Sequence, residues 1–165
     1  MTRTTTEKID LLWNLFVHRT DTYAEQWFDP NRGGGYNRRK VGTCPHSPKC
    51  ITECPSITYL PLERQHLVAH VKGDITVATY AINTDATVKW LCLDMDIRKG
   101  EEGDVRQLTL DVAKFVASFL PRNAWRVEFS GSRGYHLWIF FAEPVDVAKA
   151  YSLGMWIRQN VTYDP

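Results

Sequence analysis

Asp94 and Asp96 stand two residues apart in an otherwise apolar run, WLCLDMDI, at residues 90–97. Side chains alternate between the two faces of a strand, so an extended run places both carboxylates on one face. Neighbouring carboxylates repel each other unless a cation lies between them, and oxygen ligands of this kind suit Mg²⁺ or Mn²⁺. The pair therefore predicts a divalent metal site. The alternative is a solvated strand end, with Asp96 already in a turn.

A second polar group lies further along the chain, in the segment EFSGSRGYHLW. Gly131 and Gly134 allow a tight turn and a close approach of the backbone to a ligand. The Ser130 hydroxyl, the Arg133 guanidinium and the His136 ring are groups that hold phosphate oxygens. The segment therefore predicts a hairpin whose turn binds phosphate.

If the strands that carry the two motifs are neighbours, Asp94, Asp96 and His136 share one polar face and can act on one ligand. Carboxylates that hold a metal ion, beside donors that hold a triphosphate, are the elements of two-metal phosphoryl transfer. We therefore interpret these three residues as catalytic, and Ser130, Arg133 and His136 as nucleotide-binding. The alternative for His136 is a packed strand histidine.

Three cysteines and a histidine cluster in the middle of the first half of the chain. In a cytosolic protein such clusters indicate metal ligands before disulfides. Three thiolates and one imidazole make a closed tetrahedral zinc site. The predicted structural zinc ligands are Cys44, His46, Cys50 and Cys54. His46 is close to Cys44 in sequence, so His66 and His70 remain open as alternatives for the fourth ligand.

Residues 30–50 carry five basic side chains and no acidic one, together with three consecutive glycines. Aromatic and basic side chains bind single strands by stacking and by charge. We expect Tyr36, Arg38 and Arg39 to contact a nucleic-acid template or primer. An ordinary solvated loop is the alternative.

Hydrophobic periodicity and helix-end signals predict the elements that position these groups. The expected helices span 7–19, 21–27, 61–71, 104–120 and 146–160. The expected strands span 75–82, 88–97, 125–129 and 135–141. Residues 30–56 lack a sustained period and are expected to be irregular.

The order from residue 88 is β-α-β-β-α, which is an α+β unit of the ferredoxin-like or RNA-recognition-motif-like type without its last strand. Either residues 75–82 supply the missing edge, or the sequence is part of a longer protein; we favour the second. The predicted domains are a helical, Cys/His-rich region at 1–73, stapled by zinc, and a palm at 74–165.

Length and composition fit a globular protein of 165 residues, with 44% hydrophobic and 24% charged residues and a net charge of +1. No run approaches the roughly 18 apolar residues of a membrane span. The N-terminal sequence lacks the apolar stretch of a signal peptide. These features predict a cytoplasmic protein with no membrane partner.

The pair LDMD and FSGSRGYHLW resembles the first two motifs of the archaeo-eukaryotic primase superfamily. Further segments, among them LFVHRTDTYAEQWF, KCITECP and HLVAHVKGDITVATY, are similar to primase-polymerases of TOTE conflict systems and CRISPR-associated primase-polymerases. The likeness runs from about Leu15 to Pro144. It implies a palm of the RNA-recognition-motif type, with Asp94 and Asp96 as metal ligands.

By the same resemblance, Ser130, Arg133 and His136 contact the incoming nucleoside triphosphate. Arg126 and Ser132 have no firm counterpart and receive no role. The superfamily also has a third motif, a further acidic residue that completes the metal site. Neither Asp146, at the start of a predicted helix, nor Asp164, at the end of the sequence, fits that role, so the palm is expected to lack its third motif.

The sequence thus favours a template-directed primase-polymerase that joins nucleoside triphosphates with Mg²⁺ or Mn²⁺ on a single-stranded DNA template and primer. A helicase, nuclease or CRISPR adaptation protein, fused or bound, is a further candidate partner that the sequence does not decide. The rival hypothesis is a non-catalytic, zinc-containing module that binds single-stranded nucleic acid. Base-stacking modules do not need paired acids on the sheet, and a triphosphate site does. A metal-dependent nuclease is a weaker third hypothesis.

Overall fold

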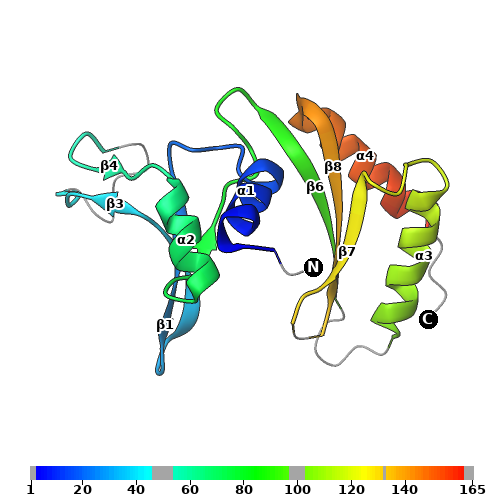
Figure 1. The fold of residues 1–165 in the computed structure, drawn as a ribbon, viewed down its shortest axis with the longest axis horizontal. Helices are drawn as coiled ribbons and strands as arrows, with labels where there is room; N and C mark the ends of the chain where they lie inside the picture. The colour runs from blue at the N-terminus through cyan, green and yellow to red at the C-terminus, as the bar shows by residue number, and fades with distance from the viewer. Residues whose placement is uncertain (1–2, 46–53, 97–102, 132, 162–165) are drawn as a thin grey trace. The chain divides into compact units, whose positions relative to one another are not determined.

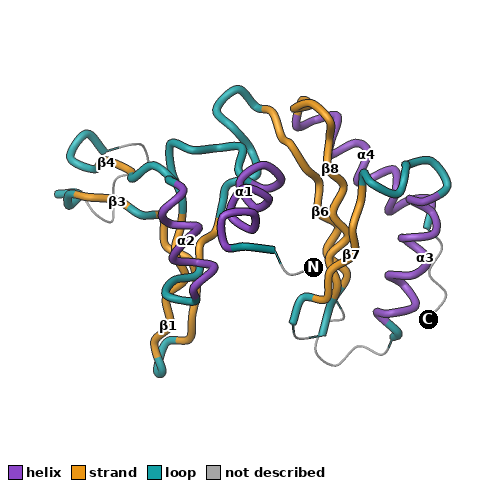
Figure 2. Tube along the Cα trace, viewed as in Figure 1, coloured by secondary structure: helices purple, strands orange, loops and turns teal. Residues whose placement is uncertain are grey.

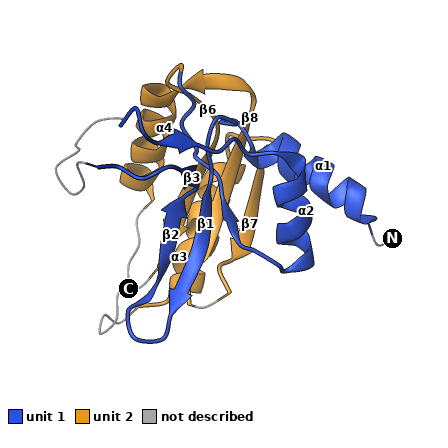
Figure 3. Ribbon diagram, turned by 90° about the vertical axis from the view of Figure 1, so that its left-hand side faces the viewer, with its two compact units in different colours: residues 1–84 blue, residues 85–165 orange. Residues whose placement is uncertain are grey.

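The computed structural model describes residues 3–45, 54–96, 103–131 and 133–161. The chain divides into two compact units, residues 1–84 and 85–165, which Figure 3 colours separately. Each unit has its own helices, strands and hydrophobic core, so the protein is of the α+β class. Within the described ranges, no helix is both long and apolar enough to span a membrane.

The first unit combines two helices with short strands (Figures 1 and 2). Its helices are α1 (Thr5–Phe16) and α2 (Arg64–Lys72). Its main sheet has the order β2-β1-β5, made of β1 (Ala24–Asp29), β2 (Gly33–Arg38) and β5 (Val77–Ala78), and β3 (Lys40–Val41) pairs with β4 (Thr58–Tyr59). Its core residues are Ile9, Val17, Tyr23, Leu62 and Leu67.

Local capping interactions fix the start of α1 and the end of α2. Thr4 caps α1 through a capping box with Glu7. Gly73 ends α2 in the left-handed conformation, with φ at 84°, which favours glycine.

Two predictions for this unit are wrong. Residues 21–27 do not form a helix, because Ala24–Asp29 pairs along its whole length with Gly33–Arg38 as an antiparallel hairpin. The predicted irregular segment therefore contains a strand, and the unit is mixed α and β rather than helical. Trp27 lies opposite Gly35, where a side chain on the glycine would meet the indole at 3.2 Å. The glycines that suggested a loop thus make room for aromatic side chains across the hairpin.

The strand expected at 75–82 is reduced to Val77–Ala78, which pairs with Ala24 and Glu25 of β1. This pairing places it in the sheet of the first unit. The alternative in which this segment supplies the missing edge of the palm is therefore wrong.

The second unit has the predicted order β-α-β-β-α. Its elements are β6 (Thr87–Met95), α3 (Val105–Ala117), β7 (Trp125–Phe129), β8 (Tyr135–Asp146) and α4 (Val147–Asn160). Its antiparallel sheet has the order β6-β8-β7 among the described residues. Figure 1 shows α3 and α4 on one side of this sheet.

Aspartates cap the N-termini of both helices in this unit. Asp104 accepts hydrogen bonds from the backbone N–H groups of Arg106 and Gln107 and so begins α3. Asp146 accepts one from the N–H of Ala148 at 2.8 Å and begins α4. Asp146 pairs with Thr87 at the opposite end of β6 from Asp94, so it is a helix cap and not a third ligand at the carboxylate pair.

Side chains along β6 alternate between the hydrophobic core and the opposite face of the sheet. Leu91, Leu93 and Met95 pack into the core with α3 and α4, around the fully buried Leu137 of β8. The intervening side chains of Cys92 and Asp94 therefore lie on the other face. We call this other face the carboxylate face; it comprises Trp90, Cys92 and Asp94 of β6, His136 and Trp138 of β8, and Arg126 and Glu128 of β7.

Candidate functional site

One row of polar side chains crosses the three strands of the carboxylate face. Asp94 is the direct cross-strand partner of His136, and His136 is the direct partner of Glu128. His136 Nε2 lies 3.8 Å from Asp94 Oδ1, and His136 Nδ1 lies 3.2 Å from Glu128 Oε2. The imidazole therefore lies between two carboxylates that come from different strands. The predicted neighbourhood of the two motifs is present in the structure.

Aromatic side chains form the next row. The Trp138 Nε1–H donates to Glu128 Oε2 at 2.8 Å, so a single carboxylate oxygen contacts both the indole and the imidazole. The Trp138 ring meets Trp90 edge-on, with centroids 5.1 Å apart. These contacts restrain Trp138 and, through it, Glu128.

Cys92 lies beside these acids. Burial, followed by the negative charges of Asp94 and Glu128, raises the pKa of the Cys92 thiol to about 12. The thiol is therefore protonated at neutral pH.

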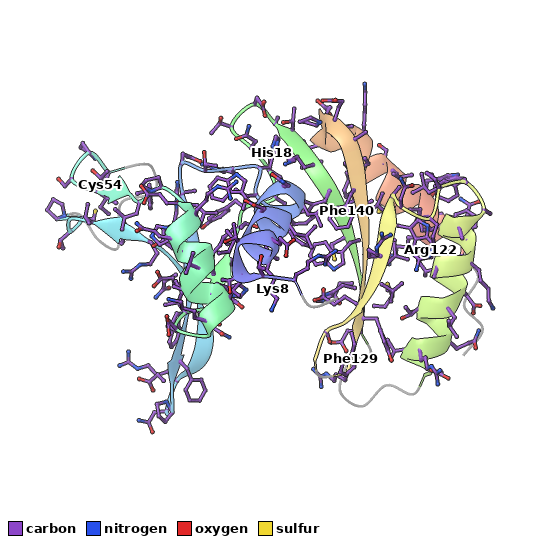
Figure 4. All side chains as sticks on the ribbon, viewed as in Figure 1. Lys8, His18, Cys54, Arg122, Phe129 and Phe140 are labelled. Atoms are coloured by element: carbon purple, nitrogen blue, oxygen red, sulfur yellow. The ribbon has the colours of Figure 1, made fainter. Side chains whose placement is uncertain are left out.

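The turn between β7 and β8 is closed at its base. The Ser130 N–H donates to the Gly134 carbonyl at 3.0 Å, and the Gly134 N–H donates to Ser130 Oγ at 3.2 Å. Gly131 has a φ of 88°, in the left-handed region that favours glycine. Figure 4 marks Phe129 where β7 enters this turn. Ser132 lies outside the described residues.

Gly134 also fixes the distance between this turn and β6. A Cβ on Gly134 would lie 2.7 Å from the Met95 carbonyl oxygen, so only glycine allows this approach. The approach brings the turn to Asp96, the first residue after β6, and Arg133 Nε lies 3.6 Å from Asp96 Oδ1. The structure thus pairs Asp96 with Arg133 beside the pair of Asp94 and His136.

A pocket of about 330 Å³ lies beside the two aspartates. It is lined by every residue from Cys92 to Asp96, which point to alternate faces, so it runs along the edge of β6 that is not paired with β8. Its helix side is formed by Leu108, Val112, Ile157, Arg158 and Val161. The pocket therefore has an apolar wall and one basic side chain next to the carboxylates.

The structure describes only part of the predicted zinc site. Cys44 is half-buried and Cys54, labelled in Figure 4, is buried; His46 and Cys50 lie outside the described residues. Within the described part of the chain, no three His, Cys, Asp or Glu side chains lie close enough to hold one metal ion.

The two alternative zinc ligands are engaged in the fold of the first unit. His66 Nδ1 accepts a hydrogen bond from the Glu63 N–H at 2.9 Å, and its ring lies against Tyr23 with centroids 4.4 Å apart. His70 Nδ1 lies 3.3 Å from the Ile75 carbonyl oxygen. Both contacts hold α2 in place.

The predicted nucleic-acid contacts lie on and beside β2, where Tyr36 is half exposed. The Arg38 guanidinium stacks on the Tyr59 ring, 3.3 Å from its centroid, and its Nε donates to the buried Thr22 hydroxyl at 2.6 Å. Arg39 Nε lies 3.3 Å from a Glu25 carboxylate oxygen. A pocket of about 470 Å³ is lined by Asn37, Arg38, Arg39, Lys40 and Tyr59. Both arginines thus have a role in the fold as well as a basic charge beside a pocket.

Glu128 is the site residue that sequence reasoning missed. Alternation places it on the face of Asp94 and His136, but that pattern alone does not give it a partner. Its bonds to Trp138 and His136 depend on the pairing register of β7 and β8, which the sequence does not state.

The chain is similar to the polymerase domain of Ligase D from Mycobacterium tuberculosis, a structure solved in complex with DNA, with a TM-score of 0.51 and 16% sequence identity. The match covers 96% of this chain and 62% of that chain, so the chain spans less than two thirds of that structure.

The family described as "TOTE conflict system, Archaeo-Eukaryotic Primase domain" matches residues 7–164. The chain therefore belongs to this family, as its motifs predicted, and is a primase-polymerase domain of a nucleotidyltransferase family that typically uses divalent metals. No curated protein gives a significant match. The CRISPR-associated branch and the domain boundary at residue 73 stay predictions.

Proposed function

We propose that this protein is a template-directed nucleotidyltransferase that joins nucleoside triphosphates with two divalent metal ions, a primase-polymerase. The observation that carries the proposal is the pairing of each aspartate of one motif with a basic or imidazole side chain of the other. Asp94 faces His136 across the strands, and Asp96 faces Arg133 across the turn. Metal-binding and phosphate-binding groups therefore meet at one end of the sheet.

The carboxylates fit Mg²⁺ or Mn²⁺. The side chain of Asp94 is 70% exposed and that of Asp96 is 45% exposed, so a hydrated cation can reach both. Mg²⁺ is commonly held by one or two carboxylates together with substrate phosphates and water. Bound there, the metal would neutralise charge on the transferring phosphoryl group and activate the attacking 3′-hydroxyl. The expectation that the palm lacks the third acidic motif of the superfamily stays a prediction, and Asp164 lies outside the described residues.

The triphosphate is held by the turn and by His136. Ser130 Oγ and the turn backbone provide hydrogen-bonding groups, and the Arg133 guanidinium provides a forked cationic donor. Arg133 and His136 each contact a carboxylate at the longer end of ion-pair distances, 3.6 and 3.8 Å. Phosphate oxygens placed between these groups would replace such contacts with shorter, charge-assisted ones.

The first unit provides the surface for a single-stranded DNA template and primer. Tyr36 is exposed for base stacking, while Arg38 and Arg39 line a pocket whose positive charge suits phosphate. Cys44, His46, Cys50 and Cys54 would hold a structural zinc ion, which metal analysis of the purified protein checks. A fused or associated helicase, nuclease or CRISPR adaptation protein belongs to the same proposal.

The second candidate function is non-catalytic binding of single-stranded nucleic acid. The half-exposed Tyr36 beside the basic pocket favours it, because this surface does not depend on the carboxylates. The catalytic function requires Asp94 and Asp96, whereas binding of single-stranded nucleic acid does not.

The test is primer extension on a single-stranded template with Mn²⁺. Asp94→Ala combined with Asp96→Ala should lower synthesis by at least about 1,000-fold, because the metal ligands are lost. The control is Glu143→Ala, which removes an exposed carboxylate of β8 and should leave synthesis unchanged. Oligonucleotide binding and the melting temperature should be unaltered in both variants. Normal synthesis by the double variant would overturn the metal assignment, and an inactive wild type that binds DNA would favour the second function.

A further inference from the structure

Glu128 has no role in the proposal above, although it is the third polar side chain of the row. Its carboxylate oxygen Oε2 lies 2.8 Å from Trp138 Nε1 and 3.2 Å from His136 Nδ1. A carboxylate only accepts hydrogen bonds, so the proton shared with the ring is on Nδ1. This contact fixes which imidazole nitrogen is left for a ligand.

The register excludes Glu128 from the metal site of Asp94. His136 pairs with Asp94 on one side and with Glu128 on the other. Adjacent strands are about 4.8 Å apart, so the two acids stand roughly 10 Å from each other, too far to hold one ion. His136 lies between Glu128 and Asp94, so Glu128 can act on the metal site through the imidazole ring.

The surroundings of Glu128 are built to hold it still. The indole of Trp138 donates to it, and Trp138 in turn lies against Trp90, with ring centroids 5.1 Å apart. The side chain of His136 is 30% exposed, so its ring has room to turn if that restraint is lost. Glu128 thus connects a packed aromatic pair to the imidazole.

We propose that Glu128 is a positioning residue for the incoming nucleoside triphosphate. By accepting the Nδ1 hydrogen bond, it orients His136 so that Nε2 faces Asp94 and the phosphates held there. This inference rests on the proposed function, because it requires His136 to contact the triphosphate.

The experiment measures calorimetric binding of dATP in Mn²⁺ to the full chain. Glu128→Ala should weaken binding about tenfold, the value of one well-placed hydrogen bond to a charged group. Glu128→Gln should stay within about twofold, because its amide oxygen accepts the same bonds. Glu143→Ala, with an exposed acid on β8, is the matched control and should have no effect.

A double-mutant cycle separates positioning from a general structural effect. In the His136→Ala background, Glu128→Ala should add no further loss, because the ring it orients is gone. Binding of dAMP, which lacks the β- and γ-phosphates, should be insensitive to Glu128→Ala. Should Glu128→Ala fail to fold, Trp138→Phe keeps the aromatic packing, removes the indole donor, and should give a smaller loss of the same kind.

The outcomes distinguish this inference from the proposal on which it rests. If His136→Ala binds dATP like the wild type, the triphosphate site itself is wrong, and the role of Glu128 falls with it. If His136→Ala weakens binding but Glu128→Ala does not, only the positioning role is wrong. Additive losses of binding free energy in the cycle would also overturn the positioning role. A loss in Glu128→Gln as large as in Glu128→Ala would overturn it as well, in favour of a role for the negative charge of Glu128.

Discussion

The carboxylate face and the basic segment around β2 both gather charged side chains, but they use them differently. On the carboxylate face, His136 lies 3.8 Å from Asp94 and 3.2 Å from Glu128, on strands whose backbone pairing already fixes their positions, and Arg133 of the adjoining turn lies 3.6 Å from Asp96. In the basic segment, Arg38 stacks on Tyr59 and donates to the buried Thr22 hydroxyl. Side chains of the first kind can exchange partners with a ligand while the fold persists, whereas Arg38 also stabilises its own unit.

The largest expected effect on stability comes from disrupting the close backbone approach of the β7–β8 turn to β6, beside the carboxylate face. Gly134→Ala should destabilise the second unit by about 2–3 kcal/mol, because the added Cβ would lie 2.7 Å from the Met95 carbonyl oxygen. It should also abolish detectable dATP binding by moving the turn away from Asp96. Urea denaturation and calorimetry measure the two effects.

The control for this prediction is Gly131→Asn in the same turn. Gly131 has a φ of 88° with open space around it, so an asparagine there carries backbone strain but meets no neighbouring atom. The unfolding free energy of Gly131→Asn should fall by about 1 kcal/mol, less than that of Gly134→Ala. Equal losses in the two variants would mean that the turn is generally sensitive, rather than held close to β6.

In the basic segment around β2, a smaller effect on stability distinguishes Arg38 from its neighbour Tyr36. Arg38→Ala should lower the free energy of unfolding by about 2 kcal/mol, since it removes a cation–π contact and leaves the Thr22 hydroxyl without this donor. Tyr36→Ala should leave stability unchanged and weaken binding of a single-stranded oligonucleotide about fivefold or more. Urea denaturation and fluorescence anisotropy measure the two quantities.

Arg32→Ala, in the β1–β2 turn, is the control for Arg38. It removes the same charge without a stacking partner in the core of the unit and should leave stability within about 0.5 kcal/mol. If Arg38→Ala and Arg32→Ala are equally stable, Arg38 acts only as a surface charge, and the contrast between the two regions is wrong.

The second unit was largely predictable from the sequence because its signals are local. Alternation predicted Trp125–Phe129 with its observed ends, and the order of the elements allowed the strands of Asp94 and His136 to be neighbours, as they are. The helices predicted at 104–120 and 146–160 begin at the aspartates that cap α3 and α4.

The first unit was less predictable because distant pairings override local signals. Local signals predicted a helix at 21–27, yet Ala24–Asp29 forms β1 by pairing with Gly33–Arg38. The Tyr59 partner of Arg38 comes from β4, after the cysteine-rich segment. Glu128 shows the same limit in the second unit, since its face was predictable and its partners were not.

The most direct test of the central claim is calorimetric binding of dATP and ATP to the full chain, with Mn²⁺ and with EDTA. The carboxylate face predicts micromolar binding that requires the metal and is lost in both Asp94→Ala and His136→Ala, while Glu143→Ala binds like the wild type. Binding of equal strength in EDTA, or binding that survives both substitutions, would contradict the assignment of this face as a metal-dependent triphosphate site.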